Sequence, residues 1–215
     1  MNDADRAYVA PPWASPGRIA DVNDETLALL QRLMGASQIY CSTMTGVLER
    51  LLEEAGGTQL ALSQLKLLML ISRSQYRLKV TDVADFLDVS NAAASRAIDR
   101  LVQRGLVHRA IAPDNRRAVD LTLTDEGRAL LGQFQDLRDQ EMKRLLGSYP
   151  ADKLREVTQA LDELSVLMLD LDEAAEQQCL RCDVHFRRGC VLREVLGVDC
   201  ESRTALFETA RHAAE

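Results

Sequence analysis

Apolar residues recur at helical spacing along most of the chain, which predicts long helices on either side of a central region of different character. The longest predicted helix covers residues 21–54, where Leu27 and Leu30 belong to a broad apolar face. A shorter helix over 62–73, begun by Ser63 or a neighbour, would support the central region. A helix as long as the first would expose apolar area in a lone domain, so part of it should contact a second copy of the chain.

The second half of the chain predicts two more long helices. Thr124 is suited to be an N-cap and is followed by acidic residues, which fits the start of a helix that ends near Leu146. The next helix runs from Ala151 to about Glu176, and its apolar residues are spaced alternately by three and four. They are Leu154, Val157, Leu161, Leu164, Met168 and Leu171. A core stripe within one chain would have the same spacing, but three long helices outside the central region favour a bundle shared by two copies.

The central region predicts two short helices followed by a β-hairpin. One helix covers Val80–Leu87, and the next begins after a Ser90 cap and ends near Arg104. Gly105 ends it, because glycine adopts the left-handed conformation at little cost. Two β-prone runs follow at 106–111 and 118–123, with turn-forming residues between them. This order is typical of a winged helix-turn-helix.

The same residues resemble the MarR family of bacterial transcription regulators. The resemblance rests on Ser90 to Arg104, Gly105-Leu106-Val107, Arg109, Pro113 to Arg117, Val119, Leu121 to Thr124 and Gly127. It extends over roughly residues 27–171. It implies a mainly α fold, a winged helix-turn-helix with long dimerisation helices and a small β-hairpin wing. It also implies a homodimer that binds a pseudo-palindromic site on double-stranded DNA.

The resemblance and the periodicity together divide the chain into four parts. These are an irregular N-terminal arm (1–20), a helical dimerisation region (21–60 and 124–176), the winged helix-turn-helix (61–123) and a cysteine-rich tail (177–215).

The second central helix offers the side chains that a DNA-reading helix needs, which are short polar or methyl groups for base edges and long cations for phosphates. The candidates on this helix are Ser90, Asn91, Ala92, Ser95, Arg96 and Arg100. By resemblance to the family, Arg116 at the wing tip would enter the minor groove. Asp114 would hold that arginine in place, and Arg117 is a candidate phosphate ligand.

Composition first argues against DNA binding, because the formal net charge of the 215 residues is −7. The stretch 73–117, however, has nine basic and five acidic residues, so its own net charge is positive and the excess of acidic residues lies on either side of it. No apolar run reaches about 18 residues and no signal core is present, so we expect a cytoplasmic protein that does not enter membranes. We find no nucleophile–base pair, phosphate loop or paired catalytic carboxylates, so an enzyme is the weak alternative.

Four of the five cysteines lie within residues 179–200, spaced C-x₂-C-x₇-C-x₉-C. Cys179, Cys182, Cys190 and Cys200 are candidate ligands of an iron–sulfur cluster, most plausibly [4Fe–4S], which would sense redox state, oxygen, nitric oxide or iron. A structural zinc site is the alternative, with His185 as a possible ligand, and a small-molecule effector would then bind elsewhere. Free thiols without a metal are the third possibility.

Overall fold

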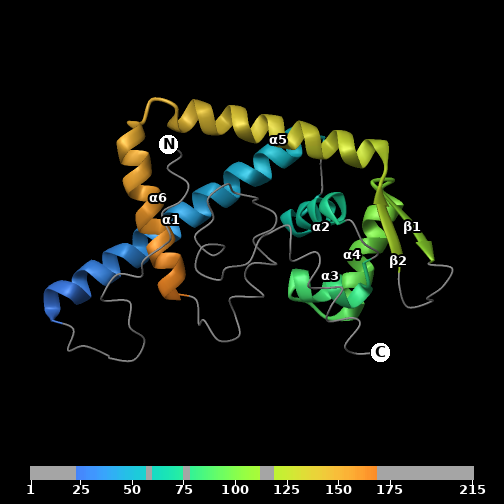
Figure 1. The fold of residues 1–215 in the computed structure, drawn as a ribbon, viewed down its shortest axis with the longest axis horizontal. Helices are drawn as coiled ribbons and strands as arrows, with labels where there is room; N and C mark the ends of the chain where they lie inside the picture. The colour runs from blue at the N-terminus through green and yellow to red at the C-terminus, as the bar shows by residue number, and fades with distance from the viewer. Residues whose placement is uncertain (1–22, 57–59, 75–77, 112–118, 169–215) are drawn as a thin grey trace, which may run out of the picture.

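The computed structural model describes residues 23–56, 60–74, 78–111 and 119–168, which form six helices and two strands (Figure 1). In chain order they are α1 (Asp24–Glu54), α2 (Leu62–Arg73), α3 (Val80–Leu87), α4 (Asn91–Gln103), β1 (Val107–Ile111), β2 (Val119–Leu123), α5 (Asp125–Leu146) and α6 (Ala151–Met168). The predicted fold class, mainly α with a small β-hairpin, is confirmed. The N-terminal arm, the wing tip and the cysteine-rich tail lie outside the described residues.

Short polar side chains set the starts of three helices. The side chain of Asn23 accepts a hydrogen bond from the backbone N–H of Thr26 at 2.8 Å, so α1 begins at Asp24, three residues later than predicted. Ser90 and Thr124 cap α4 and α5 in the same way, as predicted. The predicted continuation of α6 beyond Met168 lies outside the described residues.

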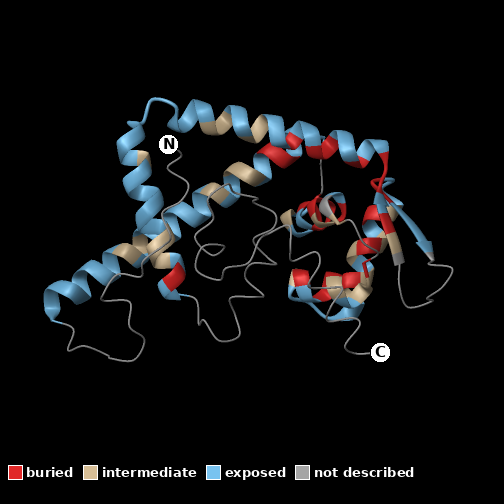
Figure 2. Cartoon of the chain, viewed as in Figure 1, coloured by how far each residue is buried: buried red, intermediate tan, exposed pale blue. Residues whose placement is uncertain are grey.

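The core lies where the C-terminal end of α1, helices α2 to α4 and the first turns of α5 meet, as the buried residues in Figure 2 show. Its largest fully buried side chains are those of Leu52, Leu67, Leu68, Val83, Ile98, Leu101, Val107 and Phe134. The first half of α1 and most of α6 are exposed instead. Their exposed apolar residues include Leu27, Leu30, Met34, Ile39, Tyr40, Val157, Leu161 and Met168. One chain therefore completes the core of the winged helix-turn-helix but leaves long apolar helix faces uncovered.

An ion-pair network joins α1 to the far part of α5. Glu141 accepts a hydrogen bond from Arg144 at 2.6 Å and another from Arg50 of α1 at 2.5 Å, and its side chain is only 11% exposed. The hydrogen bond from Arg144 and the neighbouring Arg50 lower the pKa of Glu141 to about 2. The network holds α5 along α1 beyond the end of the apolar core.

Candidate nucleic-acid interface

A sharp turn between α3 and α4 directs the start of α4 outward. The backbone N–H of Lys79 donates to the Asp82 carboxylate at 2.7 Å, which fixes the start of α3. Asp88 ends α3 in the left-handed conformation, with φ 55°, a region that aspartate enters more readily than most residues. Two residues later Ser90 accepts a hydrogen bond from the N–H of Ala93 at 3.3 Å and starts α4. The start of α3 and the turn into α4 are therefore fixed by local hydrogen bonds and by the left-handed conformation of Asp88.

Helix α4 has one buried face and one exposed polar face. Ala94, Ile98 and Leu101 are fully buried against the core. Of the candidate DNA-contacting residues on this helix, Ser90, Asn91, Ala92, Arg96 and Arg100 are exposed and Ser95 is half-buried. Arg96 and Arg100 are one helical turn apart, so both guanidinium groups lie along the same edge of the helix. The predicted contact residues on this helix are therefore all at least partly accessible, and its two arginines share one edge.

The wing is tied to α4 by an ion pair. Strands β1 and β2 are antiparallel, with Val107 opposite Leu123. Arg109 on β1 donates to the Asp99 carboxylate of α4 at 2.7 Å, so its charge is engaged within the protein. The three predicted DNA-contacting residues of the wing tip, Asp114, Arg116 and Arg117, lie outside the described residues, and their roles stay predictions.

Thr124 and Gly127 connect the wing rigidly to α5. Gly105 has φ 68°, the left-handed conformation predicted for the end of α4, and its carbonyl accepts a hydrogen bond from the Thr124 hydroxyl at 2.7 Å. The same hydroxyl accepts one from the N–H of Gly127 at 2.9 Å. A Cβ at Gly127 would collide with the carbonyl oxygen of Leu106. The base of the wing and the start of α5 are therefore in direct backbone contact.

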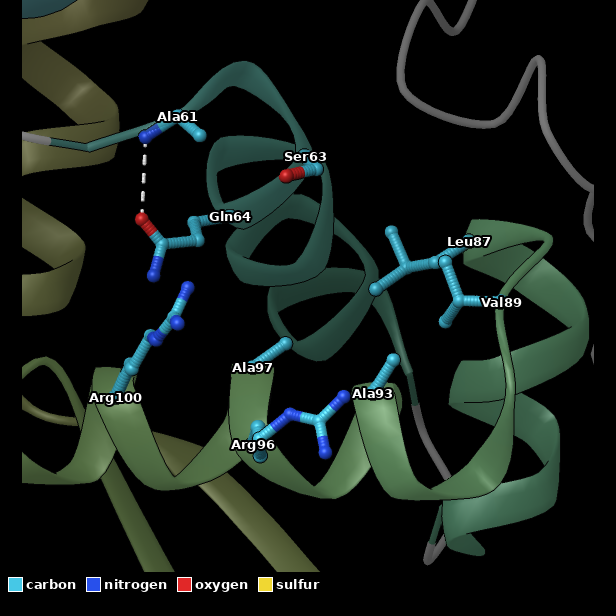
Figure 3. A pocket seen from close by; sticks show the side chains of 9 residues that line it. All are labelled: Ala61, Ser63, Gln64, Leu87, Val89, Ala93, Arg96, Ala97 and Arg100. Carbon is cyan, nitrogen blue, oxygen red and sulfur yellow. Dashed lines mark hydrogen bonds between the residues drawn. The ribbon is translucent and has the colours of Figure 1, made fainter.

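A cleft of about 280 Å³ lies between the first turn of α2, the end of α3 and α4 (Figure 3). Its lining includes Ser63, Gln64, Arg96 and Arg100. Gln64 is only 8% exposed, and its side-chain oxygen accepts a hydrogen bond from the N–H of Ala61 at 3.1 Å. The helix thus begins at Leu62, as predicted, with Ala61 as its N-cap, and Ser63, one of the residues expected to begin it, lies within its first turn. Sequence reasoning missed Gln64, because only the packing of α2 against α4 brings it to the candidate DNA-binding surface.

The cysteines are not tested by the described part of the chain. Cys41 is exposed on α1, whereas Cys179, Cys182, His185, Cys190 and Cys200 lie outside the described residues. Within residues 23–168, leaving out the undescribed gaps, no group of three or more histidine, cysteine or acidic side chains is placed to hold a metal ion. No helix in the described part of the chain is long and apolar enough to cross a membrane.

Comparison with known proteins finds a family match in the middle of the chain. Residues 60–119 match the model of the MarR family. This segment, the MarR-type domain, is similar to that family. This MarR-type domain contains α2, α3, α4 and β1, and so includes the exposed face of α4 and the cleft beside it.

The curated relatives that the chain resembles are HTH-type transcriptional regulators. The chain is 30% identical over 100 residues to the uncharacterized HTH-type transcriptional regulator YvnA of Bacillus subtilis, a match that covers 45% of this chain and 63% of that protein. It is 42% identical over 50 residues to the transcriptional repressor MdtR of the same organism, covering 23% and 32% of the two chains. Both matches span less than two thirds of the relative.

The structural likeness extends beyond the MarR-type domain. A solved MarR family transcription regulator aligns with a TM-score of 0.59 over 68% of this chain and 95% of its own length. At 16% identity this shows the fold alone. The long helices around the domain are thus part of a fold that this solved structure shares.

Proposed function

We propose that this protein is a transcription regulator that binds double-stranded DNA through the MarR-type domain. The observation that carries the proposal is the exposed face of α4, where Arg96 and Arg100 lie one helical turn apart, with Asn91 exposed at the start of the helix. Side chains of these types can bond base edges and phosphates when such a helix enters the major groove. The α4 helix is held at a fixed angle to the wing by Asp99 and Arg109, so the helix and the wing would meet the DNA as one body.

We further propose that the DNA-binding unit is a homodimer and that its site is a pseudo-palindrome. The support is the set of apolar side chains that one chain leaves exposed on α1 and α6, including Met34 at 64% and Met168 at 79%. Long helices with uncovered apolar faces bury them in a helix bundle with a second copy. A two-fold dimer would present two copies of α4, spaced to read two half-sites about one helical turn apart.

Fluorescence anisotropy with a labelled duplex of mixed sequence tests the DNA-binding proposal. We expect binding at low salt, with an affinity that falls steeply and linearly on a logarithmic scale as salt rises, because phosphate contacts release counterions. Absence of binding at low salt would refute the proposal. Sedimentation of the same sample tests the dimer, and a monomer at micromolar concentration would refute that part.

For the signal, we propose that Cys179, Cys182, Cys190 and Cys200 bind an iron–sulfur cluster, most plausibly [4Fe–4S]. The support is the sequence alone: four of the five cysteines fall within 22 residues, near several arginines that would offset thiolate charge. A cluster supplies a change of charge and ligation on reaction with oxygen, nitric oxide or an electron donor. We expect such a change to alter the geometry between the two DNA-binding domains of the dimer.

Structural zinc is the second candidate, with His185 in place of one cysteine, and the effector would then be a small molecule bound between the DNA-binding domain and the dimer helices. The visible spectrum and metal content of protein purified without oxygen distinguish the two. Iron with acid-labile sulfide and a brown colour support the cluster. A colourless protein with about one zinc per chain supports the zinc site, and protein without either metal would refute both.

A further inference from the structure

The cleft between α2 and α4 contains a buried hydrogen-bond donor that faces no acceptor among the described residues that line it. Gln64 is 8% exposed, and its side-chain oxygen accepts from the N–H of Ala61. A backbone N–H can only donate, so the amide of Gln64 has one possible orientation, with its oxygen toward Ala61. Its NH₂ group therefore points into the cleft, where Figure 3 shows it facing the guanidinium group of Arg100.

Two groups that can only donate hydrogen bonds thus point at one another. Leaving a buried donor without a partner costs free energy, and native structures rarely do so without a reason. An acceptor atom between Gln64 and Arg100 would satisfy both groups. Because Arg100 is charged and Arg96 lines the same cleft, the acceptor that fits best is an oxygen of an anion.

The first turn of α2 adds to this preference for an anion. The cleft is lined by Ala61 and Ser63 at the start of the helix, and the first N–H groups of a helix lack carbonyl partners within it. The positive end of the helix dipole lies at the same place. The positive end of α2 and the side-chain donors of Gln64 and Arg100 therefore lie around one small volume.

We infer that this cleft holds a phosphate of the DNA backbone, with Gln64 and Arg100 donating hydrogen bonds to its oxygens. The inference rests on the proposed DNA binding and adds to it a contact outside α4 and the wing. DNA is the source that the geometry favours, because Arg96 and Arg100 line the cleft and also lie on the face of α4 proposed to enter the groove. A phosphate in the cleft would fix how deeply and at what angle α4 enters.

The test is Gln64→Glu, measured by anisotropy with the mixed-sequence duplex. Glutamate has the same shape and can accept the same hydrogen bond from Ala61, so the cap of α2 is kept. It replaces the donor in the cleft with a negative oxygen. We expect DNA affinity to fall by about tenfold to a hundredfold, the range for losing a hydrogen bond to a charged group, with an unchanged or higher thermal midpoint.

Gln103→Glu is the matched control, because it makes the same change at an exposed residue of α4 that does not line the cleft. We expect it to lower affinity by no more than about threefold in physiological salt, where surface charges are screened. Arg100→Gln should reduce the slope of log affinity against log salt by about 0.9 for each phosphate that the protein no longer neutralises. The double variant Gln64→Met, Arg100→Gln should lose less binding free energy than the two single variants lose together, because both side chains would contact the same phosphate.

Inorganic phosphate is the probe for a free anion. Equal losses of DNA affinity in Gln64→Glu and Gln103→Glu would overturn the inference. A second outcome would overturn DNA as the source of the phosphate. In that outcome Gln64→Glu binds DNA with unchanged affinity, and inorganic phosphate raises the thermal midpoint of the unsubstituted protein but not that of the variant. The cleft would then be a site for a free oxyanion. Failure of the unsubstituted protein to bind DNA would contradict the proposed function itself.

Discussion

Replacing Gly127 by alanine should destabilise the contact between the wing and α5. The new Cβ would collide with the carbonyl oxygen of Leu106 and lie 3.2 Å from its carbonyl carbon. The backbone of α5 or of β1 would have to shift by about 1 Å to restore normal contact. Overpacking of this kind costs about 1–3 kcal/mol, and the upper part of that range applies because both sides of the contact are backbone.

Gly132→Ala is the control, since Gly132 lies in the same helix and a Cβ there meets nothing within 4 Å. Alanine favours helix over glycine by about 1 kcal/mol in both variants, so the difference between them isolates the collision. We expect Gly127→Ala to be less stable than Gly132→Ala by about 2–3 kcal/mol. The measurement is urea unfolding at one fixed protein concentration, because dimerisation would make stability depend on concentration. Equal stability of the two variants would refute the reasoning.

Three further predictions follow from individual residues. Thr124→Ala removes the hydroxyl that caps α5 through Gly127, and urea unfolding should show a loss of about 1–2 kcal/mol; a loss below about 0.5 kcal/mol would contradict the role of the cap. The pKa of Glu141 is lowered to about 2, first by Arg144, so the charged carboxylate stabilises the fold fully above its ordinary pKa of 4.5 and loses this effect as pH falls through about 2. Glu141→Gln should therefore be less stable than the unsubstituted protein at neutral pH and equally stable near pH 2, and a pH-independent difference between the two unfolding curves would show the account to be wrong. Arg116→Ala should lower specific DNA affinity severely without changing the thermal midpoint, and undiminished binding in a gel-shift titration would rule out its predicted contact.

The elements predicted best from the sequence are those that depend on neighbouring residues. The starts of α4 and α5 follow from Ser90 and Thr124, whose side chains bond N–H groups three residues later. The left-handed end of α4 follows from Gly105 in the same way. The start of α1, three residues later than predicted, is set by the side chain of Asn23.

The parts that could not be predicted depend on contacts between distant segments. Gln64 reaches the proposed DNA-binding surface only because α2 packs against α4. The ion pair between Asp99 and Arg109 likewise needs the wing to fold back on α4, and periodicity carries no information about it. The wing tip and the cysteine-rich tail remain predictions from the sequence and from resemblance, because they lie outside the described residues.

Two-fold reading of DNA is the central claim, and hydroxyl-radical footprinting tests it most directly. A duplex selected by this protein from a random-sequence pool would provide the target. We predict a pseudo-palindromic sequence with two symmetric protected regions centred about one helical turn apart, one for each α4, with additional protection outside them from the wings. A single protected region without symmetry, or no selected sequence at all, would contradict the account.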